Sequence, residues 1–241
     1  MMKGKKISAI VSVFNEERTV KDIIIALLKC HLVDEVIVVD DGSTDNTSQI
    51  LNQLTKTFGF KYIRFDRNKG KSYAMVAGIE NSSGDILLFV DADIIGFNCT
   101  HVEQLVVPLV TKSVNMTIGR RCPLNSHRID LTGPIDVWLG GERACFKNEI
   151  LPIIEEIRKT KYGVETLLNL YYKSKNGKIL IVDLDGLIHL KKYEKYRFDK
   201  ALIDYLKATS QIVTTIFLNY LLIFNIFKNS FKNVSFKGII K

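Results

Sequence analysis

Two carboxylates, Asp91 and Asp93, stand at the end of a short apolar run, and this pair is where the chain could do chemistry. The run, residues 87–90, follows a Gly-Asp turn signal and is too short for a helix, so it predicts a strand buried on both faces. Acids at a buried strand end need a cation nearby. Ligands bind at this end in open α/β sheets, and paired oxygens suit Mg²⁺ or Mn²⁺ on a diphosphate. The alternative is that both acids only cap the next turn.

A second acid pair, Asp40 and Asp41, ends another predicted strand, residues 35–39, and is followed by Gly42. The glycine permits a turn, and Ser43, Thr44 or Asp45 can cap the next helix, so much of this segment has a structural explanation. Two consecutive acids exceed what capping requires, and a carboxylate here can accept hydrogen bonds from a base or a ribose. We expect Asp41 to select a base with a ring N–H, which favours UDP first and GDP second.

The elements that must position these acids alternate between strands and helices. A β-branched segment, residues 7–13, predicts the first strand, and Asn15 with Glu16 and Glu17 predicts the start of a helix. Further strands are expected at residues 62–65, 114–118 and 178–182, and further helices at residues 73–80 and 164–172. The order predicts an α/β fold with a mostly parallel, doubly wound, Rossmann-like sheet flanked by helices.

A basic loop precedes the helix expected at residues 73–80. Its Gly70-Lys71-Ser72 triplet is not a P-loop, because that motif needs a glycine where this chain has Phe65. Lys69, Lys71 and the helix N-terminus could still meet phosphates. The alternative is a solvated basic loop.

Length and composition bound these possibilities. With 241 residues, 25% charged and 46% hydrophobic, the chain is long enough for one large globular domain. The net charge of +8 lies mostly in a basic tail, since ten Lys or Arg and three Asp or Glu follow residue 190. Four cysteines show no C-x-x-C spacing and no signal peptide is recognisable, so we expect a reducing cytosol.

Four segments, in this order and spacing, resemble the signature of glycosyltransferase family 2 on the GT-A fold. They are Val13-Phe14-Asn15-Glu16-Glu17, Val39-Asp40-Asp41-Gly42-Ser43-Thr44-Asp45, Asn68-Lys69-Gly70-Lys71 and Asp91-Ala92-Asp93. The resemblance implies a nucleotide-sugar donor, with UDP-glucose favoured. It places a donor-binding set at Val13, Asn15, Glu16, Asp41, Lys71 and Asp91, and puts Asp93 on the metal.

The second half is similar to the glucosyl-3-phosphoglycerate synthases, through Gly140-Gly141-Glu142-Arg143, Tyr162-Gly163-Val164-Glu165 and His189. That similarity implies a sugar or acceptor site at Gly141, Glu142, Arg143 and Glu165. It also makes His189 the second metal ligand beside Asp93. Each of these residues also has a purely structural alternative. Glu142 and Arg143 could form an ion pair at the start of a helix, and Glu165 could be an acid in the first turn of its helix. His189 could be a surface histidine or one whose hydrogen bonds are made within the fold. The acceptor stays open.

The catalytic candidates follow from the reaction. A departing diphosphate gains negative charge, which a divalent ion on Asp93 and nearby lysines would stabilise. An inverting enzyme also needs a carboxylate base on the acceptor hydroxyl, and Glu142 and Glu165 are the candidates. A retaining enzyme needs none, and the sequence leaves both stereochemical outcomes open.

Two other classes of protein use a similar fold. A nucleotidyltransferase would place a glycine-rich, lysine-bearing loop directly after the first strand, where this chain has Phe14-Asn15-Glu16-Glu17. A non-catalytic nucleotide-sugar-binding protein would keep the fold without needing the acids.

The tail, residues 201–241, is expected to be an apolar and basic helix outside a GT-A domain of residues 1–200. Residues 208–227 carry no charge but are interrupted by polar side chains, which makes a poor membrane span. Gln211, Thr215 and Asn219 share a helical face, as on an interfacial helix. We expect peripheral contact with anionic lipid at the cytoplasmic membrane face, and no nucleic acid. The alternative is packing on its own domain or on a second subunit in a homodimer.

Overall fold

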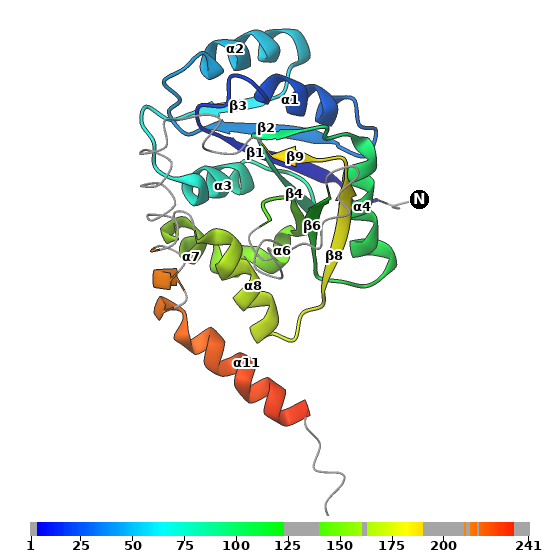
Figure 1. The fold of residues 1–241 in the computed structure, drawn as a ribbon, viewed down its shortest axis with the longest axis vertical. Coiled ribbons are helices and arrows are strands. Elements are labelled where there is room, and N and C mark those ends of the chain that lie inside the picture. The colour runs from blue at the N-terminus through cyan, green and yellow to red at the C-terminus, as the bar shows by residue number, and fades with distance from the viewer. Residues whose placement is uncertain are drawn as a thin grey trace, which may run out of the picture.

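A computed structural model describes residues 4–122, 140–160, 163–189, 210, 213–215 and 217–233. Its centre is a seven-stranded sheet in the order β3-β2-β1-β4-β7-β6-β8 (Figure 1). The strands are β1 (Ile7–Val13), β2 (Glu35–Asp40), β3 (Lys61–Arg64), β4 (Ile86–Asp91), β6 (Met116–Cys122), β7 (Arg143–Phe146) and β8 (Ile179–Asp185). Only β7 among them is antiparallel to its neighbours, β4 and β6, so the prediction of a mostly parallel sheet is confirmed.

Helices cover both faces of this sheet, because alternate residues of each strand point to opposite sides. Ile7, Ala9, Val11 and Val13 of β1 belong to a core shared with α1 (Val20–Leu28), α2 (Thr47–Phe58) and α4 (Cys99–Thr111). Ile10 belongs to a second core, shared with α3 (Lys71–Glu80), α7 (Ile154–Lys159) and α8 (Val164–Ser174). Figure 1 shows these two groups of helices on either side of the strands. The expected doubly wound architecture is therefore present.

The register of the parallel strands brings their polar ends to one edge. Ser12 of β1 lies opposite Asp91 of β4, and Val13 of β1 lies opposite Asp40 of β2. The two acid pairs of the sequence therefore share the carboxyl edge of the sheet.

A small ladder lies next to this edge. β5 (Ile94–Ile95) pairs antiparallel with β9 (Ile188–His189), and Ile94 is opposite His189. Two backbone segments far apart in the chain therefore meet one residue after Asp93.

One local prediction is wrong, and one alternative is excluded. Asn15 does not cap a helix: it is left-handed with φ of 57°, and α1 begins only at Val20 after Thr19. Glu142 and Arg143 do not start a helix, because Arg143 opens strand β7. The expected strand at residues 114–118 extends to Cys122, since β6 pairs in parallel with β8 as far as Asp185.

The structure also joins Cys30 and Cys99 in a disulfide, with Cα atoms 5.0 Å apart. The sequence does not predict this pair, because 69 residues separate the two cysteines. The bridge connects the end of α1 to the start of α4.

The tail contains α11 (Tyr220–Asn233), which packs beside α8. Thr215 is buried, and Leu222 packs against the core of α3, α7 and α8. Gln211 lies outside the described residues. Within the described ranges, no helix combines the length and the apolar character that a membrane crossing needs. The described residues also form the short elements α6 (Lys147–Ile150) and η1 (Leu151–Ile153).

Candidate active site

Asp91 is the centre of an ion-pair network at the carboxyl edge of the sheet. Its Oδ1 lies 2.7 Å from Nζ of Lys71, the first residue of α3. Its Oδ2 lies 2.9 Å from an Nη2 of Arg121, near the end of β6. Both oxygens of this carboxylate are therefore held by cations from separate elements.

Two glutamates extend the network on either side. Lys71 Nζ lies 2.7 Å from Oε1 of Glu165, in the first turn of α8. Arg121 donates two hydrogen bonds to Glu142, of 2.8 and 2.9 Å. The charges therefore alternate in the order Glu165, Lys71, Asp91, Arg121 and Glu142.

Burial and charge act in opposite directions on this network. Burial by itself would raise the pKa of Asp91, but Lys71 and Arg121 outweigh it and hold that pKa below its ordinary value. Burial by itself would lower the pKa of Lys71, but Asp91 and Glu165 raise it. Burial raises the pKa of Glu142 above its ordinary value although Arg121 opposes the shift. The two cations thus keep Asp91 ionised although its side chain is largely buried.

Gly141 leaves the room that the Asp91 carboxylate occupies. A Cβ atom at this position would collide with the side-chain oxygens of Asp91. A small pocket opens here, lined by Ser12, Lys71, Asp91, Gly141, Arg143 and Glu165. The glycine predicted for the sugar or acceptor side therefore lies in the same pocket as Lys71 and Asp91, two of the six predicted donor-binding residues.

Arg143 is a buried residue that lines this pocket. Its guanidinium is buried and donates to the carbonyl of Gly140 at 2.6 and 3.0 Å and to Oδ1 of Asn169 at 3.1 Å. Glu142, the residue before β7, pairs with Arg121 of β6 instead. The alternative of a Glu142–Arg143 ion pair is therefore excluded.

Asp41 anchors the basic loop. Its two oxygens accept hydrogen bonds from the backbone N–H groups of Lys69, at 2.7 Å, and Gly70, at 2.8 Å. Burial raises the pKa of Asp41 although these two donors oppose the shift. Each carboxylate oxygen has a second lone pair, so the loop contact and the predicted contact to a base are compatible.

The first predicted motif lies against the turn that follows Asp41. Val13 accepts a backbone hydrogen bond from Asp41 at 2.8 Å. Asn15 Oδ1 accepts from the N–H of Thr44 at 2.8 Å, and the N–H of Glu16 donates to Thr47 Oγ1 at 2.9 Å. These contacts explain the left-handed backbone of Asn15, and they bring the two motifs together.

The residues around Asp93 fit a divalent cation by their chemistry. Asp93 is half-buried, and its charge acts on both Asp91 and Arg121. The β5–β9 ladder brings the backbone of His189 opposite Ile94. The side chain of His189 lies outside what the structure describes. Carboxylate and imidazole donors together suit Mn²⁺ and, with less preference, Mg²⁺.

Arg121 is the member of the network that the sequence argument did not identify. It stands in the triplet Gly119-Arg120-Arg121, and its distance in sequence from Asp91 does not predict a contact between them. What would have identified Arg121 is the pairing of β6 with β8, which extends far enough to align Arg121 with Leu184. The pairing places Arg121 within the sheet and directs it to Asp91, whereas Arg120 bonds Asp183 on the surface.

Comparison with known proteins divides the chain into two parts. Residues 8–122 match the model of the family described as glycosyl transferase family 2, which confirms the resemblance for this part. The poly-β-1,6-N-acetyl-D-glucosamine synthase of Staphylococcus epidermidis is 34% identical over 88 residues, which are 36% of this chain and 21% of that enzyme. The chain therefore matches about a fifth of the length of this relative.

Solved structures extend the likeness to nearly the whole fold. Glucosyl-3-phosphoglycerate synthase from Mycobacterium tuberculosis, in complex with Mn²⁺, UDP-glucose and phosphoglyceric acid, aligns with a TM-score of 0.68 and 23% identity. The alignment covers 88% of this chain and 80% of that one. The same enzyme with Mg²⁺ and UDP aligns at 0.67 and 24% identity, over 88% and 78%. The fold is thus GT-A-like, as the sequence predicts.

Proposed function

We propose that this chain, which matches glycosyl transferase family 2 over residues 8–122, is a metal-dependent glycosyltransferase. It would move a hexose, with glucose favoured, from a nucleotide-diphosphate sugar to a hydroxyl acceptor. One observation carries the proposal: Asp91, Lys71 and Arg121 form a network at the carboxyl edge of the sheet, beside the turn that Asp41 begins. Ligands of open α/β sheets bind at this edge.

The donor side is assigned from its contacts. Asp41, Asn15 and Glu16 border the turn expected to face the base and ribose, and Lys71 starts α3, whose N-terminus favours phosphate. UDP is the proposed nucleotide, because a carboxylate acceptor at Asp41 matches the ring N–H of uracil. The M. tuberculosis synthase, which binds UDP-glucose with Mn²⁺, supports this choice.

Asp93 and His189 are the proposed protein ligands of the cation. When bound, a divalent ion supplies charge stabilisation to the departing diphosphate. The chain's own contribution is positional. Lys71 and Arg121 hold Asp91 in place, and Glu165 and Glu142 hold these two cations in turn.

The two glutamates are not equivalent as candidate bases. Glu142 is fully buried and bound twice by Arg121, whereas Glu165 lines the pocket and is 7% exposed. If transfer inverts the anomeric centre, Glu165 is the better placed base for the acceptor hydroxyl. If transfer retains it, Glu165 orients the sugar or the acceptor through its bond to Lys71. Gly141 and Arg143 shape the pocket on that side.

The test is turnover of labelled UDP-glucose with and without Mn²⁺, measured as hydrolysis or transfer. We expect activity that is lost in excess chelator and in Asp93→Ala, with Asp183→Ala as a matched control because Asp183 lies on the surface. Full turnover in chelator would overturn the metal role. Donor binding without any release of UDP would favour a non-catalytic binding protein, and release of glucose 1-phosphate would favour a nucleotidyltransferase.

We also propose that the tail attaches the protein to an anionic lipid surface. The tail turns an apolar stripe outward, at residues spaced by three and four along a helix: Val213, Phe217, Leu221 and Phe224, each at least 60% exposed. Thr215 and Leu222 face the domain. The stripe supports contact with lipid, and lysines such as Lys228 would add about 1 kcal/mol each near anionic headgroups.

Sedimentation with anionic vesicles tests the tail. Removing it would also uncover α8, so Phe217→Ser with Phe224→Ser is the cleaner variant, and Phe58→Ser is a control because Phe58 is an exposed aromatic far from the tail in sequence. The double variant should stay in the supernatant while the control pellets and is released by high salt. Pelleting of the double variant would refute lipid attachment, and a concentration-dependent dimer lost in that variant would assign the stripe to a second subunit.

A further inference from the structure

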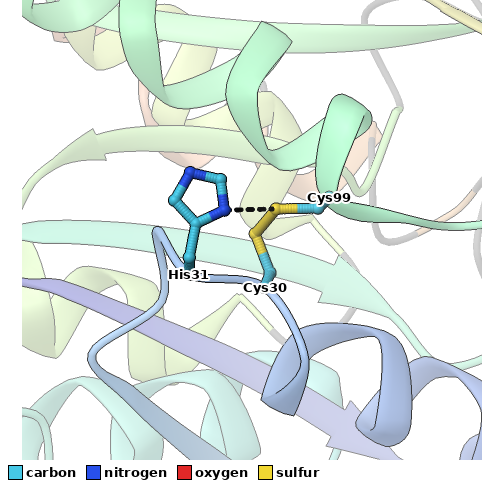
Figure 2. Close-up of side chains that lie close together, drawn as sticks. All are labelled: Cys30, His31 and Cys99. Carbon is cyan, nitrogen blue, oxygen red and sulfur yellow. Dashed lines mark hydrogen bonds between the residues drawn. A yellow bond between two sulfur atoms is a disulfide. The ribbon is translucent and has the colours of Figure 1, made fainter.

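The Cys30–Cys99 bridge lies outside the candidate active site and has its own chemical surroundings (Figure 2). Cys30 follows α1 and is buried, with 3% of its surface exposed. Cys99 is half-buried and is the first residue of α4. The exposed side chain of His31 reaches the bridge, with Nδ1 3.8 Å from Sγ of Cys99.

The surroundings of Cys99 favour a thiolate when the bridge is open. The N-terminus of the 13-residue helix α4 carries partial positive charge. The imidazole of His31 can accept the thiol proton, and the resulting cation would face the sulfur. Both effects are those that activate cysteines for exchange with disulfides. Cys30, in contrast, has the buried position of a resolving cysteine.

These three residues also have the composition of a metal site, since their ligand atoms all lie within 4.8 Å of one another. A thiolate binds zinc, however, whereas a sulfur in a disulfide does not. Because the structure joins both sulfurs, exchange chemistry accounts for the arrangement better than a metal does.

We propose that Cys30 and Cys99 form a reversible thiol–disulfide exchange site for small-molecule thiols and disulfides. In closure, the Cys99 thiolate attacks a small disulfide and expels one thiol, which leaves a mixed disulfide on Cys99. Cys30 then attacks Sγ of Cys99 and expels the second thiol. The protein loses two electrons and two protons, and the small disulfide becomes two thiols. In opening, the same steps run in reverse, with two thiols as the reductant.

Closure would restrain the segment that leads from Asp93 to α4. This segment is otherwise held by the Asn98–His101 capping box and by His101 Nε2, which lies 3.0 Å from the carbonyl oxygen of Asp185. The bridge adds a covalent tie from this segment to α1. Opening it should therefore increase hydrogen exchange of amides at residues 96–101 while exchange in β1 stays unchanged.

Alkylation followed by mass spectrometry tests the bridge in the wild-type protein. After treatment with oxidised glutathione, we expect only Cys122 and Cys145 to be alkylated in denaturant, since these are the free cysteines. After dithiothreitol treatment of the folded protein, all four should be alkylated, and the melting temperature should fall by about 5–15 °C. Cys122→Ser is the control and should keep this response.

Single variants test the order of the steps. Cys30→Ser should trap glutathione on Cys99, Cys99→Ser should trap little on Cys30, and His31→Ala in the Cys30→Ser background should slow trapping several-fold. Four reactive thiols after oxidation would overturn the proposal, as would a bridge that opens only in denaturant. So would stoichiometric zinc whose removal by chelator is needed before Cys30 and Cys99 react.

Discussion

The ion pair between Lys71 and Glu165 should be worth several times more than an exposed pair in the same protein. Lys71 and Glu165 approach to 2.7 Å, and their side chains are 27% and 9% exposed. At an effective dielectric constant of about 20, the attraction at this separation is about 6 kcal/mol. Desolvation of both groups offsets most of it. We therefore expect a coupling free energy of about 2 kcal/mol.

Arg120 and Asp183 provide the internal comparison. They form a pair at 2.5 Å with a second hydrogen bond of 2.8 Å, but their side chains are 46% and 48% exposed. Solvent screening limits such pairs to about 0.5 kcal/mol. The two pairs therefore differ in burial more than in geometry.

The assay is a double-mutant cycle by urea unfolding at neutral pH. The buried cycle uses Lys71→Met, Glu165→Gln and their combination, and the exposed cycle uses Arg120→Met and Asp183→Asn. Lys71→Met alone should lower the free energy of unfolding by about 3 kcal/mol, because it also deprives Asp91 of a partner. A buried coupling no larger than the exposed one would refute the argument that partial burial strengthens this network.

Four further outcomes follow from the same site. Gly141→Ala should lower activity and stability together, since its methyl group would displace the Asp91 carboxylate; unchanged kinetics would show that the pocket can relax. The folded-state pKa of Asp91 is depressed, so its stabilising contribution should be complete above about pH 4 and should decline as the pH falls further; acid titration of Lys71→Met should show a smaller loss than wild type. His189→Ala should weaken Mn²⁺-supported turnover more than Mg²⁺-supported turnover, and an unchanged Mn²⁺ titration would remove His189 from the metal site. Asp41→Asn should cost about 1–2 kcal/mol of stability, because the amide offers one acceptor to two backbone donors; equal binding of ADP and UDP by the wild type would contradict its role in base selection.

The sequence predicted the fold well where hydrophobic pattern and strand ends coincide. The strand of residues 7–13 was predicted with its observed bounds, and the helix carrying Glu165 differs only at its C-terminal end. Leu167, Leu168 and Tyr171 of that helix are buried. Such features depend on local periodicity, which the sequence displays directly.

Features that depend on pairing between distant segments were not predictable in the same way. Arg121 enters the network because β6 continues along β8. The residues next to Arg121 in the sequence do not predict that pairing. The same holds for Cys30 and Cys99. Asn15 was mistaken for a helix cap because its residue type suits one, whereas the structure uses its side chain to hold Thr44 in the neighbouring turn. Local propensity was overridden by a tertiary contact.

Among the described residues, the tail meets the N-terminal end of α8, the helix that carries Glu165. A Cβ atom at Gly163, the residue that precedes α8, would collide with Thr215 of the tail, and Glu165 follows two residues later. Where two sites are coupled, the coupling free energy acts equally in both directions. If capture of the proposed lipid surface shifts Thr215 and with it the start of α8, it would alter the affinity for the proposed sugar donor, and donor would alter the affinity for the surface by the same factor.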